Sequence, residues 1–146
     1  MLRAGKAGRL INTASGQARQ GFAYTPHYAA DKFGVLGITQ SLAKELAPTG
    51  ITVSAFCPGI ITTDIWSYNE EAWGKLLGDY KPGELMAEWV ENIPLKRAGS
   101  DKDVAGLVTF LASDRGIHHG ADSGRRWRDV RVLMPVERPR ESSTAP

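Results

Sequence analysis

Tyr28 and Lys32 stand four positions apart in the segment Tyr-Ala-Ala-Asp-Lys, and together they could carry acid–base chemistry. At this spacing two side chains of a helix share a face, about one turn apart. A free tyrosine is a poor proton donor or acceptor at neutral pH, but an adjacent ammonium favours its phenolate form. A tyrosine in that setting can give a proton to a carbonyl oxygen as hydride arrives, and it can take the proton back in the reverse reaction.

Ser15 precedes Tyr28 by thirteen residues and ends a short apolar segment. Its hydroxyl could donate a hydrogen bond to the same carbonyl oxygen and stabilise the developing alkoxide charge. A tyrosine and a lysine at this spacing are common on solvated helix faces, so the pair alone indicates little. The serine at a strand end, together with Pro58-Gly59 after the next strand, makes the combination specific.

The elements that must position these residues are a strand, a long helix and a second strand. Residues 9–15 form a short apolar run that predicts a buried strand, and residues 51–57 are apolar and β-branched and predict another. Residues 16–26 are expected to form a loop. Because a strand, a helix and a strand in this order form a βαβ unit, we expect parallel strands and a right-handed crossover.

The long helix is expected over residues 27–47. Thr25 is a candidate N-cap, Pro26 suits a first turn, and Pro48 with Gly50 ends the helix. Steps of three, four and seven residues predict one apolar face, formed by Ala29, Phe33, Leu36, Ala43 and Leu46.

Shorter helices are expected after the second strand. Residues 64–93 carry apolar side chains in short helical pieces with a break at Pro82-Gly83. Ser100 is expected to open a further helix, with Asp103 completing a capping box. The apolar face of that helix comprises Val104, Leu107, Val108 and Leu111.

The composition of the chain fits one folded domain or part of one. The 146 residues are 42% hydrophobic and carry a net charge of +2. Cys57 is the only cysteine, which excludes an internal disulfide and suits a reducing cytoplasm. Neither a membrane span nor a signal peptide is predicted. His118 and His119 have no carboxylate or cysteine at ligand spacing, so no metal is expected.

Three segments together carry a resemblance to a known family: Asn12-Thr-Ala-Ser15, Tyr28-x-x-x-Lys32 and Cys57-Pro-Gly-Ile-Ile-Thr-Thr63. From Gly8 to about Ser113 the chain resembles the second half of a short-chain dehydrogenase/reductase. The resemblance implies an α/β fold that is the C-terminal part of a Rossmann-type, doubly wound parallel sheet, with the N-terminal half missing.

The resemblance also implies a role for each matching residue. Tyr28 is then the general acid/base, Lys32 binds the nicotinamide ribose and supports the phenolate, and Ser15 orients the substrate carbonyl. The nicotinamide end of NAD or NADP is contacted by Tyr28 and Lys32 and by Pro58, Gly59, the backbone of Ile61 and the hydroxyl of Thr63.

Residues 64–93 resemble the lid that closes over substrate in this family. Trp66 and Trp73 would either line the pocket or pack within the lid. The segment from Phe56 to Trp66 most resembles acetoin/diacetyl reductases and butanediol dehydrogenases, while sugar, polyol and 3-oxoacyl substrates stay open. The implied substrate is a small ketone or alcohol, and family members are usually homo-oligomers.

Two features depart from the family pattern. The Gly-x-x-x-Gly-x-Gly turn that holds the cofactor pyrophosphate does not occur in the sequence. Residues 1–116 are therefore expected to form a partial domain. Residues 117–146 are expected to be an aberrant basic tail without order, since a one-nucleotide shift could restore the family's T-G-Q and V-D-G-G segments. No nucleic-acid-binding fold precedes this tail, so no nucleic acid is expected.

Three functions follow as alternatives. In the first, the chain is an oxidoreductase that moves hydride between NAD(P)(H) and a small ketone or alcohol, with acetoin or diacetyl as the named candidate. Alternatively, it is an inactive truncated remnant that binds no cofactor by itself. In the third alternative, the long helix pairs the chain with a full-length relative.

Overall fold

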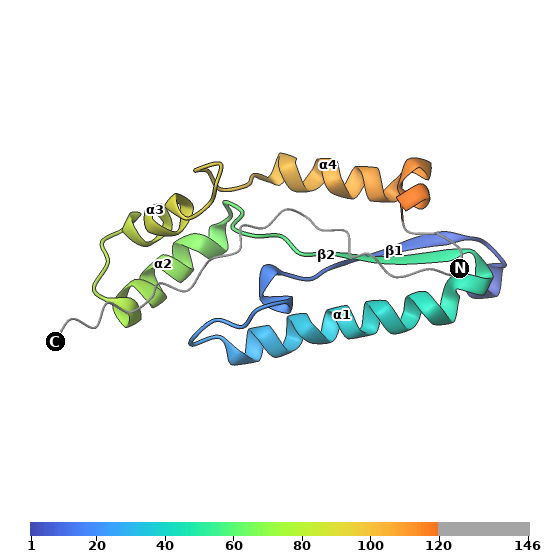
Figure 1. The fold of residues 1–146 in the computed structure, drawn as a ribbon, viewed down its shortest axis with the longest axis horizontal. Helices are drawn as coiled ribbons and strands as arrows, with labels where there is room; N and C mark the ends of the chain where they lie inside the picture. Colours follow the sequence, from blue (N-terminus) through green and yellow to red (C-terminus); the bar gives the residue numbers. More distant parts are fainter. Residues whose placement is uncertain (120–146) are drawn as a thin grey trace.

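The core of the fold is a parallel βαβ unit, seen in a computed structural model that describes residues 1–119, with side chains described up to residue 116. Strand β1 (Gly8–Thr13) pairs in parallel with β2 (Ile51–Phe56), in a register that runs from Gly8 opposite Ile51 to Thr13 opposite Phe56. Helix α1 (Pro26–Leu46) covers one face of this sheet, and α4 (Asp101–Ala112) covers the other (Figure 1). The predicted α/β class and the parallel strands are confirmed.

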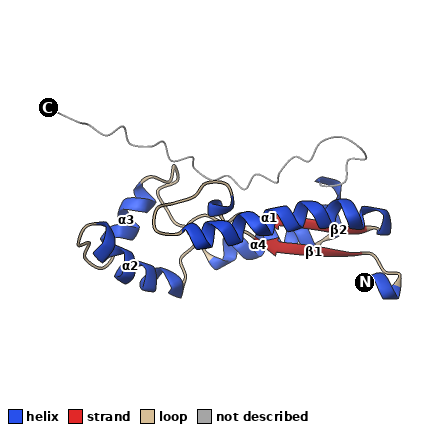
Figure 2. Cartoon of the chain, turned by 90° about the horizontal axis from the view of Figure 1, so that it is seen from below, coloured by secondary structure: helices blue, strands red, loops and turns tan. Residues whose placement is uncertain are grey.

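A pair of shorter helices, α2 (Asp64–Leu77) and α3 (Glu84–Glu91), lies beyond the carboxyl ends of both strands. Figure 2 shows the same separation between this pair and the layered part of the molecule. The predicted break at Pro82-Gly83 is confirmed, because Gly83 has a φ of 88° and precedes the first residue of α3. Glycine takes this left-handed conformation at little steric cost.

The buried face of α1 differs from the predicted one. Ala29 and Ala43 face the sheet as expected, but Phe33 is 48% exposed and Thr39 is only 3% exposed. At 3.6 residues per turn, Phe33 lies about a quarter turn from the centre of the buried face. A pattern that counts only apolar residues misses Thr39, because a buried hydroxyl is tolerated where it finds hydrogen-bond partners.

Thr39 finds those partners on β1 and on its own helix. The side-chain amide of Asn12 donates a hydrogen bond to Thr39 Oγ1 over 2.9 Å, and the Thr39 hydroxyl donates to the carbonyl of Val35 over 2.7 Å. Both polar groups are therefore satisfied inside the interface between strand and helix. This connection fixes the position of α1 along β1.

Three tryptophans hold α2 and α3 together. The ring centroids of Trp66 and Trp89 lie 5.4 Å apart in an edge-to-face arrangement, and those of Trp73 and Trp89 lie 5.5 Å apart. Leu85 is buried beside them on α3, and the Met86 amide donates to the Glu70 carboxylate over 3.1 Å. Of the two predicted alternatives, Trp66 and Trp73 thus show packing within the helix pair.

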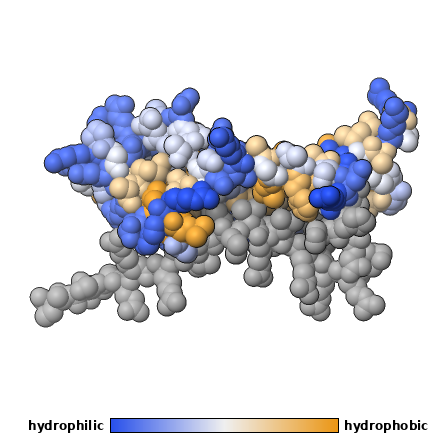
Figure 3. Space-filling model, turned by 90° about the horizontal axis from the view of Figure 1, so that it is seen from above, coloured by the Kyte–Doolittle hydropathy of each residue, from blue (hydrophilic) through white to orange (hydrophobic). Residues whose placement is uncertain are grey.

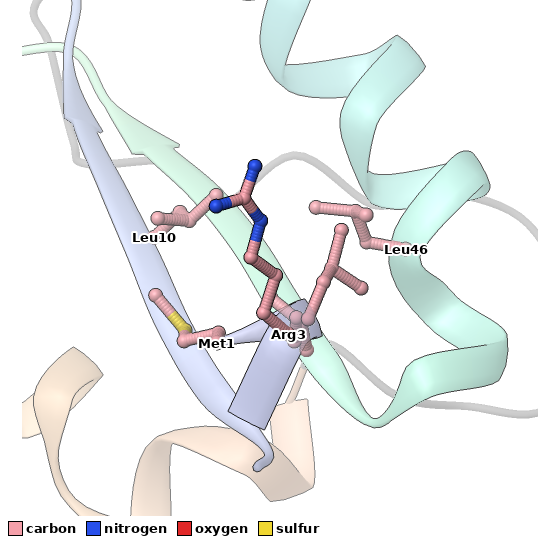
Figure 4. A pocket seen from close by; sticks show the side chains of 6 residues that line it. Met1, Arg3, Leu10 and Leu46 are labelled. Atoms are coloured by element: carbon pink, nitrogen blue, oxygen red, sulfur yellow. The ribbon is translucent and has the colours of Figure 1, made fainter. Parts of the chain in front are cut away.

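The N-terminal turn closes the opposite end of the sheet. A cavity of about 350 Å³ lies between this turn, the strands and the end of α1, and it is lined by Met1, Leu2, Arg3, Leu10, Leu46 and Ile51 (Figure 4). The sulfur of Met1 fills the space that a Cβ would occupy at Gly8. A larger residue at the start of β1 would therefore displace the Met1 side chain.

The predicted capping box of α4 is confirmed. The Ser100 hydroxyl accepts a hydrogen bond from the Asp103 amide, and the Asp103 carboxylate accepts from the Ser100 amide over 2.8 Å. Arg97 also donates to this carboxylate over 3.0 Å. The hydrogen bond from Arg97, followed by those from Ser100, holds the pKa of the Asp103 carboxyl well below its ordinary value.

The remaining sequence predictions are closely but not fully matched. The two strands end at Thr13 and Phe56, one or two residues before the predicted ends. The predicted apolar face of α4 is half-buried or buried at all four positions. Among the described residues, no helix is long and apolar enough to cross a membrane. The predicted tail of residues 117–146 lies outside the residues whose side chains are described.

Apolar surface is visible between charged regions on the face shown in Figure 3. Large apolar side chains that stay exposed along the described chain include Ile38, Ile65, Leu76 and Leu95. Contiguous surfaces of this kind commonly mark places where a protein contacts something else.

The buried bond between helix and strand can be tested with Thr39→Val. We expect the free energy of unfolding to fall by about 1–3 kcal/mol, because Asn12 then keeps a desolvated amide without its acceptor. Urea unfolding followed by circular dichroism measures the change. Thr49→Val is the matched control, since the Thr49 hydroxyl bonds only the exposed carbonyl of Leu46 at the end of α1. An equal loss in both variants would contradict this role for Asn12 and Thr39.

The capping box predicts a pH-dependent contribution to stability. A carboxyl with a lowered folded-state pKa stabilises the fold fully above its unfolded value of about 3.9 and loses this effect as pH falls toward the folded value. We therefore expect Asp103→Asn to be less stable than the wild type at pH 7, with the difference shrinking below about pH 4. Asp101→Asn, in the same helical turn, should differ less in stability from the wild type, and this difference should change less with pH. Thermal unfolding from pH 2 to 7 measures both, and a constant Asp103→Asn difference would be evidence against the ionic contribution.

Candidate active site

Ser15 lies at the carboxyl end of β1 in extended conformation and opens a short 3-10 turn over Gly16–Ala18. Its Oγ accepts a hydrogen bond from the amide of Gln17 over 3.2 Å. This bond orients the side chain but does not use the hydroxyl proton. Ser15 can therefore still donate a hydrogen bond to the oxygen of a ligand.

The turn at Ser15 is fixed against the end of the second strand. The amide of Ala14 donates to the carbonyl of Phe56 over 2.9 Å, and the amide of Gly16 donates to the carbonyl of Pro58 over 3.0 Å. Beneath the turn lies a small apolar cluster of Ala14, Ala18, Cys57, Val35 and Leu36. Because the strands are parallel, Ser15 and Pro58 meet at one edge of the sheet.

Tyr28 and Lys32 occupy the first two turns of α1, at the same end of the sheet (Figure 1). The Lys32 ammonium lies 5.5 Å from the centroid of the Tyr28 ring, which agrees with their spacing on one helix face. Lys32 Nζ also lies 3.5 Å from the carboxylate of Asp31. Tyr28 is 38% exposed, so a ligand can reach its hydroxyl.

Thr25 has a different partner from the one that the sequence predicted. It precedes α1 at the N-cap position, yet its side chain makes no capping bond to the helix. Instead, the buried hydroxyl donates its proton to Gln17 Oε1 over 2.7 Å, and the carbonyl of Phe22 lies 3.2 Å away as a second, longer acceptor. Gln17 was not among the predicted site residues, because a contact across a loop of this length leaves no periodic signal in the sequence.

The predicted cofactor residues that follow β2 lie along one extended segment. Pro58 is half-buried and Gly59 is exposed. The segment forms a short parallel bridge between Ile61 and Gly99, in which the amide of Thr62 donates to Gly99 and the amide of Gly99 donates to Ile60. Since backbone groups alternate along an extended chain, the amide of Ile61 points away from Gly99. Thr63 is exposed at the start of α2, and its hydroxyl lies 3.5 Å from the carbonyl of Ile61.

The fold thus brings the predicted site residues to one end of the βαβ unit. Ser15 and the 58–63 segment follow the two strand ends, and Tyr28 and Lys32 begin the connecting helix. A hydroxyl donor, a phenol beside an ammonium, and free backbone groups are gathered there. These groups suit the binding of a polar ligand whose oxygen exchanges a proton.

Comparisons with known proteins place this chain in a family. A family model described as Enoyl-(Acyl carrier protein) reductase matches residues 1–118. The chain is 46% identical over 111 residues to L-2,3-butanediol dehydrogenase of Corynebacterium glutamicum, with 75% of the chain and 42% of the relative covered. It is 44% identical over 108 residues to 3-oxoacyl-(acyl-carrier-protein) reductase FabG of Chlamydia pneumoniae, with 74% and 39% covered. It is 38% identical over 107 residues to an (S)-acetoin-forming diacetyl reductase of Staphylococcus epidermidis, with 73% and 42% covered.

Solved structures agree with the sequence relatives. Sorbitol-6-phosphate 2-dehydrogenase of Erwinia amylovora superposes with a TM-score of 0.75 at 35% identity, over 80% of this chain and 45% of that one. A variant of actinorhodin polyketide ketoreductase with NADPH has a TM-score of 0.73 at 34% identity, covering 78% of this chain and 43% of that one. An NAD+-bound xylitol dehydrogenase has a TM-score of 0.71 at 28% identity, covering 78% of this chain and 45% of that one.

The chain spans about two fifths of the length of the curated relatives that it matches. Within that span the matched region includes both strands, α1 and the segments that hold the candidate site. On these grounds the chain belongs to the short-chain dehydrogenase/reductase family of oxidoreductases.

Proposed function

We propose that this chain carries the proton-transfer part of an NAD(P)-dependent reductase or dehydrogenase that acts on a small ketone or alcohol. The observation that carries the proposal is the pairing of Tyr28 with Lys32 beside the Ser15 turn, at the carboxyl ends of two parallel strands. Open sheets of this type bind their ligands at that edge.

Each group has a distinct task in the proposed reaction. Ser15 donates a hydrogen bond to the substrate oxygen, which stabilises negative charge as it develops there. The Tyr28 hydroxyl transfers its proton to that oxygen during reduction and takes it back during oxidation. The Lys32 ammonium stabilises the phenolate that remains on Tyr28 and binds the ribose of the cofactor. A bound NAD(P)H supplies the hydride.

The residues present fit the nicotinamide end of such a cofactor. Gly59 and the outward amide of Ile61 offer backbone groups, and the exposed hydroxyl of Thr63 adds a donor. The sequence contains no Gly-x-x-x-Gly-x-Gly turn for the pyrophosphate. Because one similar structure holds NADPH and another holds NAD+, the proposal admits either cofactor.

For the substrate, we favour acetoin or diacetyl. Two of the similar proteins bear the names butanediol dehydrogenase and diacetyl reductase, whereas others are named for acyl or sugar substrates. We also propose a cytoplasmic protein that forms homo-oligomers. The support is Cys57, which is the only cysteine in the sequence and so forms no internal disulfide, as suits a reducing compartment, and the apolar surface on the outer side of α1.

A second candidate function is a chain that binds no cofactor by itself and associates with a longer relative. It is favoured by the share of the relatives that the chain spans and by the side chains of Phe33 and Ile38, which are 48% and 59% exposed on α1. The two candidates differ in cofactor binding, so one titration separates them.

Cofactor binding is tested by titrating the full chain with NADH and with NADPH while following cofactor fluorescence. We expect saturable binding of at least one of them. Lys32→Met should weaken it by about tenfold or more, because the lost ion–dipole contact is worth about 1.4 kcal/mol. Lys44→Met, an exposed lysine in the last turn of the same helix, should bind as the wild type does. If the wild type binds neither nucleotide, the second candidate function replaces the first.

Proton transfer is tested with Tyr28→Phe, which removes the hydroxyl and keeps the ring. We expect the rate of diacetyl reduction to fall by about 10²–10⁴-fold, the usual contribution of a general acid. Tyr24→Phe is the matched control, because Tyr24 lies four residues earlier in the chain, in the loop before α1, and is 62% exposed. Full activity in the Tyr28 variant would exclude the assigned role, and equal losses in both variants would point to a structural effect.

A further inference from the structure

The loop between Ser15 and α1 is closed by a single side-chain contact between its two ends. The Thr25 hydroxyl, in a residue only 5% exposed, donates to Gln17 Oε1 over 2.7 Å. Residues 19–24 between these ends are all exposed. Ala18 also packs against Val35 and Leu36 of α1; the hydrogen bond adds a direction that this apolar packing does not supply.

At one end of the contact, Gln17 is tied directly to Ser15. Its backbone amide donates to Ser15 Oγ, so any rotation of the Gln17 backbone changes the position of the serine hydroxyl. The next residue, Ala18, is 1% exposed and packs in the apolar cluster beneath the turn. The backbone of Gln17 is therefore fixed within the turn, and its side chain extends toward Thr25.

At the other end, Thr25 begins the helix that carries Tyr28. Its carbonyl accepts the hydrogen bond of the Ala29 amide over 3.0 Å, which closes the first turn of α1 around Tyr28. Tyr24, immediately before it, has a φ of 64°. A tyrosine seldom adopts this left-handed conformation, so the surrounding structure must hold it there. The hydrogen bond of the Thr25 hydroxyl to Gln17 and that of the Thr25 amide to the carbonyl of Phe22 provide that restraint.

We propose that Thr25 and Gln17 are positioning residues that set the distance and direction between the Ser15 hydroxyl and the Tyr28 hydroxyl. The proposal rests on the proposed function, since both hydroxyls must form hydrogen bonds to one substrate oxygen at the same time. Reacting groups lose most of their advantage when they are displaced by about 1 Å, which can cost about a hundredfold in rate. A buried bond across an exposed loop is therefore an effective control on turnover.

The test compares Thr25→Val, which keeps the shape and removes the hydroxyl, with Thr25→Ser, which keeps the hydroxyl. We expect Thr25→Val to lower kcat for carbonyl reduction by about 10–100-fold, with the KM for the cofactor little changed. Thr25→Ser should recover most of the lost rate. Gln17→Met should behave like Thr25→Val, and the double variant should be no worse than either single one, because both remove the same contact.

Amide hydrogen exchange of the full chain, followed by NMR, provides a readout that does not depend on turnover. In Thr25→Val the Gln17 amide should exchange at least about tenfold faster, because its bond to Ser15 Oγ opens more often. The amides of β2 should keep their rates. Thr49→Val, at the far end of α1, should change neither.

The outcomes separate this proposal from the proposed function. A wild type without cofactor binding or turnover contradicts the proposed function, while the exchange rates still decide whether Thr25 holds the Ser15 turn. The positioning role is wrong if Thr25→Ser is as impaired as Thr25→Val, or if the Gln17 amide is unaffected. It is also wrong if the amides of β2 accelerate equally, since that reports a general loss of stability.

Discussion

The hydrogen bond from Asn12 to Thr39 is the constraint on which the site depends most. Helix α1 has glycines at positions 34 and 37 and a narrow buried face, so apolar packing alone specifies its position along the sheet only weakly. Apolar contacts are non-directional, whereas a buried amide that needs one hydroxyl allows a single register. A slip of one turn would move Tyr28 by about 5.4 Å along the helix axis, far outside the tolerance of proton transfer.

Much of the fold follows from local rules that act on neighbouring residues. The Pro82-Gly83 break, the capping box of Ser100 and Asp103, and the order of strand, helix and strand could all be predicted, because each depends on residues within a few positions of one another. The outward turn of Phe33 and the burial of Thr39 could not be predicted, because they depend on Asn12, which lies 27 residues from Thr39 in the sequence. The N-cap position of Thr25 follows from the sequence, whereas its bond to Gln17 depends on how the loop folds back.

In the candidate site, too, some features follow from local sequence and others depend on contacts between distant residues. The spacing of Tyr28 and Lys32 is enough to place them on one helix face, and parallel strands are enough to bring Ser15 and Pro58 to one edge. The orientation of each group depends on contacts that no motif contains. Ser15 is oriented by the amide of Gln17, and the direction of the 58–63 segment is set by its bridge to Gly99. Motifs thus identify the reacting groups, and loop contacts determine how those groups face one another.

The bridge between Ile61 and Gly99 also separates the candidate site from the helix pair α2 and α3. It joins the two ends of the segment that contains α2 and α3, so this helix pair is attached to the βαβ unit at its base. A Cβ at Gly99 would lie 2.5 Å from Ile61 Cδ1, so a larger residue there would displace the end of the Ile61 side chain. The helix pair has its own core in the three tryptophans and Leu85. Side chains on the helix pair can therefore vary while Ser15, Tyr28 and Lys32 keep their positions. Such an arrangement is compatible with a family whose members are named for diols, acyl groups and sugars.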